Sequence, residues 1–284
     1  MKRIIEKFIL KQIPNLKYFH KRDSIGYKFL EHIVNSHFKK TQKEGAGVDT
    51  LPYNCGGKLN WPKVKLGNLD SYCWFQLSEM ILHYYYYINR NNYKIALDIG
   101  SNVGIDAILM AKNGFTTSAF EPDPDLFTQM EKNSELNFCK NLKMFNKGVS
   151  DKTGVLSFIK VLGNENANHI EGTRTFYGDF KRIKVDVIPF SEINVIPDLM
   201  KINVEGHEKI IVPTIPANVW EASDTFIEVH DEENAETLWH FFNKINLNIF
   251  SQKRRWKLAK NLKDMPFTNK EGYIFVTKKN KMNW

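Results

Sequence analysis

The feature that most constrains the fold is an apolar strand that runs into a glycine-containing turn and then a helix, in the stretch IALDIGSNVGID (95–106). From residue 94 onward, short apolar segments alternate with segments of helical periodicity. Alternation of this kind implies a mostly parallel sheet covered by helices on both faces. We therefore expect a doubly wound α/β domain. Its ligand should lie at the carboxyl ends of the strands, where the strand order reverses.

The periodicity predicts individual elements along this domain. Strands are expected at 95–99, 116–120, 142–146, 199–204, 225–229, 247–250 and 273–278, and helices at 104–113, 125–137 and 232–244. The segment 155–190 does not fit the alternation, and we expect an extra hairpin or a substrate loop there.

The first 90 residues lack the alternation of strands and helices. Apolar positions have helical spacing over 1–40, the Gly- and Asn-rich segment 41–68 indicates a loop, and 74–89 indicates a helix. We therefore divide the chain into an extension at 1–90, a candidate substrate cap or docking segment, and a cofactor-binding domain at 91–284.

Most of the net charge of +8 lies at the N-terminus, where residues 1–40 hold ten Lys and Arg against three Asp and Glu. A basic amphipathic segment could contact an anionic membrane, but we favour an ordinary solvated surface. Three cysteines without a CxxC pair indicate a reducing compartment, and no stretch of ~18 apolar residues is present. We expect a cytoplasmic protein, with peripheral membrane contact through residues 1–40 as an open alternative.

The turn after the first strand carries Gly100 and Gly104, with the carboxylate of Asp98 two residues before the first glycine. A phosphate loop needs GxxxxGK[ST], and a dinucleotide fingerprint needs GxGxxG, whereas Asn102 stands two positions after Gly100. An anion at position 98 would repel a phosphate. It would suit a ligand that presents an ammonium or sulfonium group.

Glu121 ends the second predicted strand, 21 positions after Gly100. An acidic residue about 20 positions after the glycine turn binds ribose hydroxyls in this type of fold. Charge-assisted hydrogen bonds of that kind are strong. A cationic nucleoside that carries an amino acid meets both requirements, so the predicted cofactor is S-adenosyl-L-methionine.

Four segments together resemble the FkbM-type methyltransferase family: LDIGSNVGIDAILMAKNG, SAFEPDPDLFTQMEKNSELN, NKGVSDKTGVLSF and DLMKINVEGHEKII. The resemblance covers about residues 92–278. It implies a Rossmann-like class I methyltransferase sheet, mostly parallel with an antiparallel C-terminal strand. It also implies an enzyme that uses S-adenosylmethionine, mainly to methylate hydroxyl groups of sugars and other metabolites.

The resemblance also implies roles for residues of this chain. The cofactor's methionine end would be held by Asp98, Gly100, Asn102 and Gly104, its ribose by Glu121, and its adenine would lie near the Gly148–Asp151 turn with Val149 and Asp151. Where the family usually has KIDVEG, this chain has KINVEG, so Asn203 replaces a carboxylate. An amide there can still hydrogen-bond a substrate hydroxyl or the cofactor amine.

A hydroxyl acceptor must lose its proton as the new bond forms. Candidate bases at the ends of the later strands are Glu205, His207, Glu228 and His230, and the spacing of the last two places them on one face of a strand end. We select Glu205, Asn203, Glu228 and His230 as catalytic candidates. A metal site is not expected, because metal-dependent hydroxyl methyltransferases need clustered carboxylates and Asn203 removes one.

The leading hypothesis is an S-adenosylmethionine-dependent O-methyltransferase that acts on a hydroxyl of a glycan or related metabolite, as in polysaccharide modification. Two alternatives stay open: a nucleic-acid methyltransferase and a membrane-surface binding protein with a vestigial cofactor pocket. The basic ends favour the first, but residues 203–206 lack the Asn/Asp-Pro-Pro-aromatic stretch of base amino-methylation, so nucleic acid is not the expected partner. Nicotinamide-dependent oxidoreduction lacks its glycine pattern.

Overall fold

The computed structural model describes Ile4, Gln12, Asn15 and the ranges 19–43, 77–175 and 178–284. The helical spacing expected over 1–40 is realised from Ile25 in helix α2 (Ile25–Lys43), which includes the first residues of the loop predicted at 41–68. The rest of that loop and the start of the helix predicted at 74–89 lie outside the described residues. Helix α3 (Leu77–Ile88) is the described part of that helix.

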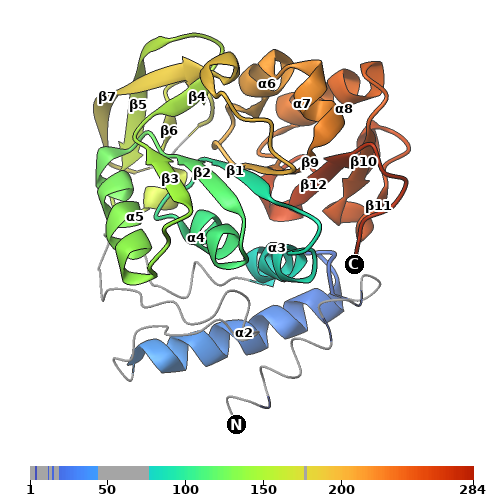
Figure 1. The fold of residues 1–284 in the computed structure, drawn as a ribbon. Helices are drawn as coiled ribbons and strands as arrows, with labels where there is room; N and C mark the ends of the chain where they lie inside the picture. The colour runs from blue at the N-terminus through green and yellow to red at the C-terminus, as the bar shows by residue number, and fades with distance from the viewer. Residues whose placement is uncertain (1–3, 5–11, 13–14, 16–18, 44–76, 176–177) are drawn as a thin grey trace.

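A large sheet forms the centre of the molecule (Figure 1), and its strand order reverses next to β1 (Ile95–Ile99). On one side of β1 lie β2 (Thr116–Phe120) and β3 (Leu142–Phe145), and on the other lie β8 (Leu199–Ile202) and β9 (Asp224–Glu228). These five strands run parallel to one another.

The C-terminal strand β12 (Tyr273–Thr277) runs antiparallel between β9 and β10 (Asn248–Ser251), and β11 (Lys257–Leu258) completes that edge. The prediction of a doubly wound, mostly parallel sheet of the class I methyltransferase type with an antiparallel C-terminal strand is therefore confirmed. Strand β11 was not predicted. It is a two-residue strand, too short to leave a periodic signal.

Helices cover both faces of this sheet, as Figure 1 shows. One face carries α3, α4 (Ile105–Lys112) and α5 (Pro124–Leu136); the other carries α6 (Glu208–Ile211), α7 (Ala217–Ala222) and α8 (Glu232–Lys244). Side chains of β1 alternate between the two cores, with Ala96 in the first and Leu97 and Ile99 in the second. Among the described residues, no helix has the length and apolar character needed to cross a bilayer.

Helix starts follow the local sequence signals. Pro124 occupies the first turn of α5, and the Asp123 carboxylate accepts a hydrogen bond from the Asp125 N–H at 2.9 Å. Asp231 caps α8 in the same way through the N–H of Asn234. These local caps explain why the two helices begin close to their predicted first residues.

A second sheet, in the order β4-β7-β5-β6, fills the segment that did not fit the alternation. Its strands are β4 (Gly148–Ser150), β5 (Gly154–Val161), β6 (His169–Ile170) and β7 (Phe180–Pro189). Strands β5 and β7 pair antiparallel, so the extra hairpin expected within 155–190 is confirmed. A turn was expected at Gly148–Asp151, but Gly148–Ser150 form strand β4, which pairs with β7. Short 3-10 helices lie at η2 (Glu165–Ala167), η3 (Phe190–Glu192), η4 (Val212–Thr214), η5 (Gln252–Arg254), η6 (Leu262–Asp264) and η7 (Asn269–Glu271).

Candidate functional site

A cavity of about 600 Å³ lies at the carboxyl ends of β1, β2, β8 and β9. Seven of the residues selected from the sequence line it: Gly100, Asn102, Glu121, Val149, Asn203, Glu205 and Glu228. Four others do not line it: Asp98, Gly104, Asp151 and His230. The structure thus brings most of the selected residues together at the edge where a doubly wound fold binds its ligand.

Gly100 permits a close approach between the loops that follow β1 and β8. Its φ is +80°, and a Cβ atom there would lie 1.8 Å from the main-chain oxygen of Asn203. Glycine is required at position 104 because of a different contact. The φ of Gly104 is +86°, and a Cβ atom there would lie 2.6 Å from Cγ of Met130 on α5. The first glycine therefore shapes the cavity, whereas the second lets α4 and α5 pack.

Glu121 joins the glycine turn to the end of β2. Its two carboxylate oxygens accept the N–H of Asn102 at 2.7 Å and the N–H of Asp123 at 2.9 Å. Burial raises the pKa of Glu121 to about 8, although these two N–H groups oppose the shift. Each oxygen keeps acceptor capacity. When it is ionised, the carboxylate can therefore accept two hydroxyl donors in the cavity that it lines.

Asp98 is fully buried behind the cavity and is paired with a lysine that the sequence reasoning missed. Lys201 Nζ lies 3.4 Å from Asp98 Oδ1 and 3.3 Å from Asp106 Oδ2. Burial raises the pKa of Asp98 to about 6 against the opposing effect of Lys201. No local sequence signal identifies this partner, because Asp98 and Lys201 are brought opposite each other only by the register of β1 and β8.

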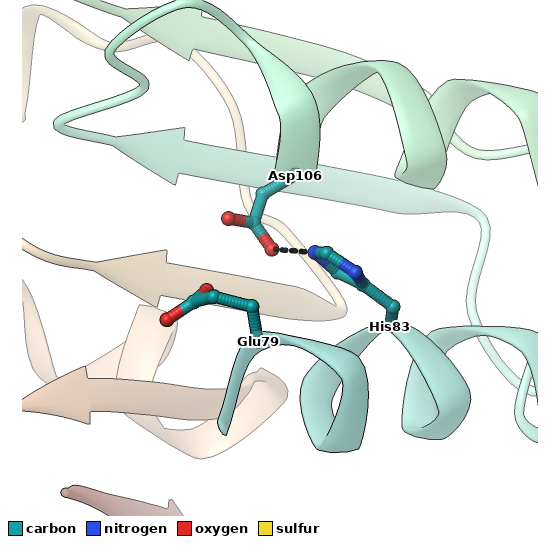
Figure 2. A group of neighbouring side chains, drawn as sticks. All are labelled: Glu79, His83 and Asp106. Carbon is teal, nitrogen blue, oxygen red and sulfur yellow. Dashed lines mark ion pairs between the residues drawn. The ribbon is translucent and has the colours of Figure 1, made fainter. Parts of the chain in front are cut away.

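A further polar group lines the cavity where α3 meets the start of α4. Figure 2 shows Glu79 and His83 of α3 facing Asp106 of α4. His83 Nε2 lies 3.3 Å from Asp106 Oδ1, which also accepts the hydroxyl of Tyr86 at 3.1 Å. Burial, with the nearby carboxylates of Asp106 and Glu228, raises the pKa of Glu79 to about 7. The (i, i+4) spacing of Glu79 and His83 on one helix face was the missed signal.

Elsewhere along the wall of the cavity, carboxylates surround His230. The Nε2 atom lies 3.4 Å from Glu205 Oε1 and 3.7 Å from Glu228 Oε2, and Nδ1 lies 2.9 Å from Glu208 Oε1. Burial lowers the pKa of His230, but the carboxylates of Glu208 and Glu228 together outweigh this effect, and the net direction is upward. Glu208 was not selected from the sequence. It fixes the far side of the imidazole and also accepts the N–H of Val204 at 3.1 Å.

Glu205 stands in the left-handed region with φ 52°, which is uncommon for a residue with a side chain. The segment after β6 holds it there. Thr173 Oγ1 donates to the main-chain oxygen of Glu205 at 3.1 Å, and Arg174 forms an ion pair with its carboxylate. Arg22, from the segment before α2, lies 3.9 Å from Glu228. Both carboxylates at this end of the cavity thus have a guanidinium nearby.

The start of the second sheet contributes the remaining predicted positions. Val149 is buried and lines the cavity, whereas Asp151 is exposed and accepts the Ser150 hydroxyl at 3.1 Å. His207 also lines the cavity, and its Nε2 lies 3.0 Å from Ser150 Oγ. Burial lowers the pKa of His207. The structure therefore separates Asp151 from the other candidate cofactor contacts.

The prediction of no metal site rested on the amide at position 203. Among the residues that the structure describes, two groups nonetheless bring histidine and carboxylate atoms within 4.8 Å of one another. The groups are Glu79, His83 and Asp106, and Glu205, Glu228 and His230.

Comparison with known proteins gives one curated relative of note, and no family model matches the sequence. The hexuronic acid methyltransferase AglP of Haloferax volcanii is 28% identical over 136 residues, which are 47% of this chain and 54% of the relative. The chain thus matches about half the length of that protein.

Several solved structures share similarity at low sequence identity. A putative methyltransferase from Streptococcus mutans in complex with SAH has a TM-score of 0.40 at 10% identity, over 70% of this chain and 96% of that one. A putative O-methyltransferase from Klebsiella pneumoniae has a TM-score of 0.39 at 10% identity, over 86% and 89%. The precorrin-6y C5,15-methyltransferase from Geobacter metallireducens has a TM-score of 0.38 at 8% identity, over 71% and 85%.

Proposed function

We propose that the chain is an S-adenosylmethionine-dependent methyltransferase of the FkbM type that methylates an oxygen of a glycan or related metabolite. The observation that carries this proposal is the pairing of Glu121 with the glycine turn beside a cavity at the switch point of the sheet. The similarity to a hexuronic acid methyltransferase supports the same reaction class.

The residues that line the cavity fit the proposed cofactor. Glu121 would accept the two ribose hydroxyls, and Val149 and Phe158 offer apolar contacts for the adenine. Gly100 and Asn102 would border the methionine end, while Asp98 acts from behind through Lys201. When bound, the cofactor supplies an electrophilic methyl group.

The acceptor would enter at the end of the cavity formed by Glu205 and Glu228. An alcohol must lose its proton during the transfer, and a carboxylate there can receive it. Glu205 is the preferred base, because Arg174 and Thr173 hold it rigidly and it lines the cavity. Asn203 Oδ1 is buried without a hydrogen-bond partner among the described residues, so it is free to accept a hydroxyl of the acceptor.

The acceptor is proposed to be an acidic glycan. Lys270 lines the cavity and would attract a negatively charged sugar, beside Arg22 and Arg174, which already lie next to Glu228 and Glu205. A hexuronic acid, the substrate class in the relative's name, offers both hydroxyl and carboxylate oxygens. Transfer to a carboxylate needs no base, so the two acceptor groups differ in their dependence on Glu205. We also propose that residues 1–90 act as a substrate cap or docking segment. A further proposal is that the protein is cytoplasmic and contacts the membrane peripherally through residues 1–40.

Cofactor binding is the first test. Calorimetry with S-adenosylmethionine and S-adenosylhomocysteine should give heat with the wild-type chain and at least a tenfold weaker affinity for Glu121→Ala. Asp151→Asn is the matched control, because this exposed carboxylate lies outside the cavity. Equal affinities in all three proteins, or heat with NAD alone, would overturn the proposal.

The acceptor can be identified with radiolabelled methyl donor and a panel of neutral glycans, uronic acid-containing glycans, RNA and DNA. Label on a uronic acid-containing glycan is expected. Alkali-stable label would indicate an ether formed on a hydroxyl, and alkali-labile label an ester formed on a carboxylate. Label on nucleic acid alone would reject the glycan assignment while leaving methyl transfer intact.

A further inference from the structure

We propose that Glu79, His83 and Asp106 form a binding site for a divalent first-row transition metal ion such as Zn²⁺ or Mn²⁺ at the wall of the cavity. Two of these side chains come from α3 and the third from the first turn of α4, and Figure 2 shows the His83 ring pointing at the Asp106 carboxylate, with Glu79 beside them. The site does not depend on the proposed methyl transfer.

The spacing of the three side chains fits metal coordination. One potential ligand atom from each residue lies within 4.8 Å of the others, and His83 Nε2 lies 3.3 Å from Asp106 Oδ1. Two ligands bound to zinc at about 2.0–2.1 Å in a tetrahedron are themselves roughly 3.3 Å apart. The imidazole and the Asp106 carboxylate are thus already placed as neighbouring ligands, and a small movement of Glu79 would complete the set.

His83 supplies an independent indication of a ligand. Its side chain is fully buried, and neither ring nitrogen makes a well-aligned hydrogen bond among the described residues, although Nε2 lies 3.3 Å from the Asp106 carboxylate. A buried polar atom without a partner is costly, and such atoms are uncommon in folded proteins. A cation bound at Nε2 would satisfy the nitrogen that points at Asp106.

Neighbouring hydroxyl groups orient the two carboxylates as a metal site requires. Tyr86 donates to Asp106 Oδ1 at 3.1 Å, and Tyr273 donates to Glu79 Oε1 at 3.0 Å. Hydrogen bonds to the ligands from a surrounding shell fix ligand direction in metalloproteins. The residues that would bind the ion are therefore held in place by groups that do not bind it.

The charge of the buried cluster also favours a divalent cation. When ionised, Asp98, Asp106 and Glu79 carry three negative charges, and Lys201 supplies one positive charge in contact with the two aspartates. Buried charge without compensation is strongly unfavourable. A divalent ion would neutralise the remaining two charges, and it can do so because Lys201 approaches Asp106 through the other oxygen, Oδ2.

The second group of potential ligands, Glu205, Glu228 and His230, suits a metal less well. Arg174 already pairs with Glu205, Arg22 lies 3.9 Å from Glu228, and the charges there are largely balanced.

The ligand types of the proposed site indicate which metal ion it would bind. One imidazole and two carboxylates favour transition ions over Mg²⁺, which prefers oxygen ligands alone. Because all three proposed ligands line the cavity, open coordination positions would face a bound molecule.

The test uses the full-length chain, stripped with a chelator, dialysed and titrated with ZnCl₂ or MnCl₂ in a calorimeter. The wild type should bind one ion per chain, and Glu79→Gln and His83→Gln should each weaken the affinity at least tenfold. Glu205→Gln is the matched control from the other group and should bind as the wild type does. Circular dichroism melting would verify that each variant folds.

Absence of binding by the wild type would overturn the proposal, as would retention of wild-type affinity in Glu79→Gln. Loss of binding in Glu205→Gln alone would assign the ion to the other group and reject this one. If His83→Gln does not fold, Glu79→Gln decides by itself, because its amide oxygen can still accept the Tyr273 hydroxyl. Failure of methyl-transfer assays would leave this binding measurement unaffected.

Discussion

Gly100 and Asn203 are in direct backbone contact across the switch point of the sheet: a Cβ atom on Gly100 would lie 1.8 Å from the Asn203 carbonyl oxygen. The loops after β1 and β8 are thereby brought against each other, and both line the cavity. Residue 100 must therefore be glycine for two reasons, its positive φ and the absence of space for any side chain.

Gly100→Ala should lower the free energy of unfolding by more than about 2 kcal/mol, since backbone strain of ~1–3 kcal/mol adds to a severe clash. Gly114→Ala is the matched control: Gly114 also has a positive φ of +96°, but nothing lies within 4 Å of its Cβ position. Urea denaturation measures the loss of stability in both variants, and the difference between the two losses gives the cost of the clash with Asn203. Equal losses in the two variants would show that the approach of Asn203 is unimportant.

Lys201→Met should destabilise the fold by about 3–5 kcal/mol at pH 7, because it leaves the buried carboxylates of Asp98 and Asp106 without their shared cation. Lys209→Met is the control, since its partner Glu233 is mostly exposed and such a pair contributes less than about 1 kcal/mol. Chemical denaturation measures both. A similar small loss for the two lysines would contradict a structural role for Lys201.

Local sequence signals were sufficient for the central part of the fold. The strand at 95–99 and the strand at 116–120 have the predicted bounds, because Gly100 directly follows the first and Gly114 and Pro122 flank the second. Helix α5 begins within one residue of its prediction because Asp123 and Pro124 specify its start locally. The spacing between Gly100 and Glu121 also identified residues that meet at the cavity. Glu121 accepts the N–H of Asn102, which lies in the turn that begins at Gly100.

Pairings between distant segments could not be read in this way. Strand β7 pairs with both β4 and β5, and nothing in Gly148–Ser150 alone distinguishes a strand from a turn. The partners of Asp98 and Glu205 are likewise remote: Lys201 follows 103 positions later, and Arg174 precedes Glu205 by 31 positions. Their charges were visible in the sequence, but only the folded register selects one partner among many.

The pH dependence of stability should reveal Glu121. Its pKa is about 8 in the folded chain against an ordinary value of 4.5, so between these values the folded state keeps a proton that the unfolded chain releases. The contribution of protonated Glu121 to the free energy of unfolding is fully present below pH 4.5. It is lost as the pH rises to 8, at up to ~1.4 kcal/mol per pH unit. Glu121→Gln should make this slope shallower between pH 5.5 and 8, with the part due to the raised pKa values of Glu79 and Asp98 remaining, whereas Glu135→Gln, on the exposed side of α5, should leave the slope unchanged. Parallel slopes for wild type and Glu121→Gln in urea melts would contradict the assignment.

Glu208 should control the protonation of His230. Burial lowers the pKa of the imidazole, but Glu208, 2.9 Å from Nδ1, and then Glu228 raise it above 6.5. The stability that these charges give to the folded state is therefore present below pH 6.5 and is lost as the pH rises through the raised value. Glu208→Gln removes the charge while keeping the shape, and the pKa of His230 should fall. The measurement is an NMR titration of the imidazole resonances, with Glu233→Gln, an exposed carboxylate of α8, as the control. The carboxylates of Glu205 and Glu228 also face Nε2, at 3.4 and 3.7 Å. An unchanged titration in Glu208→Gln would therefore assign the raised pKa to those two residues instead.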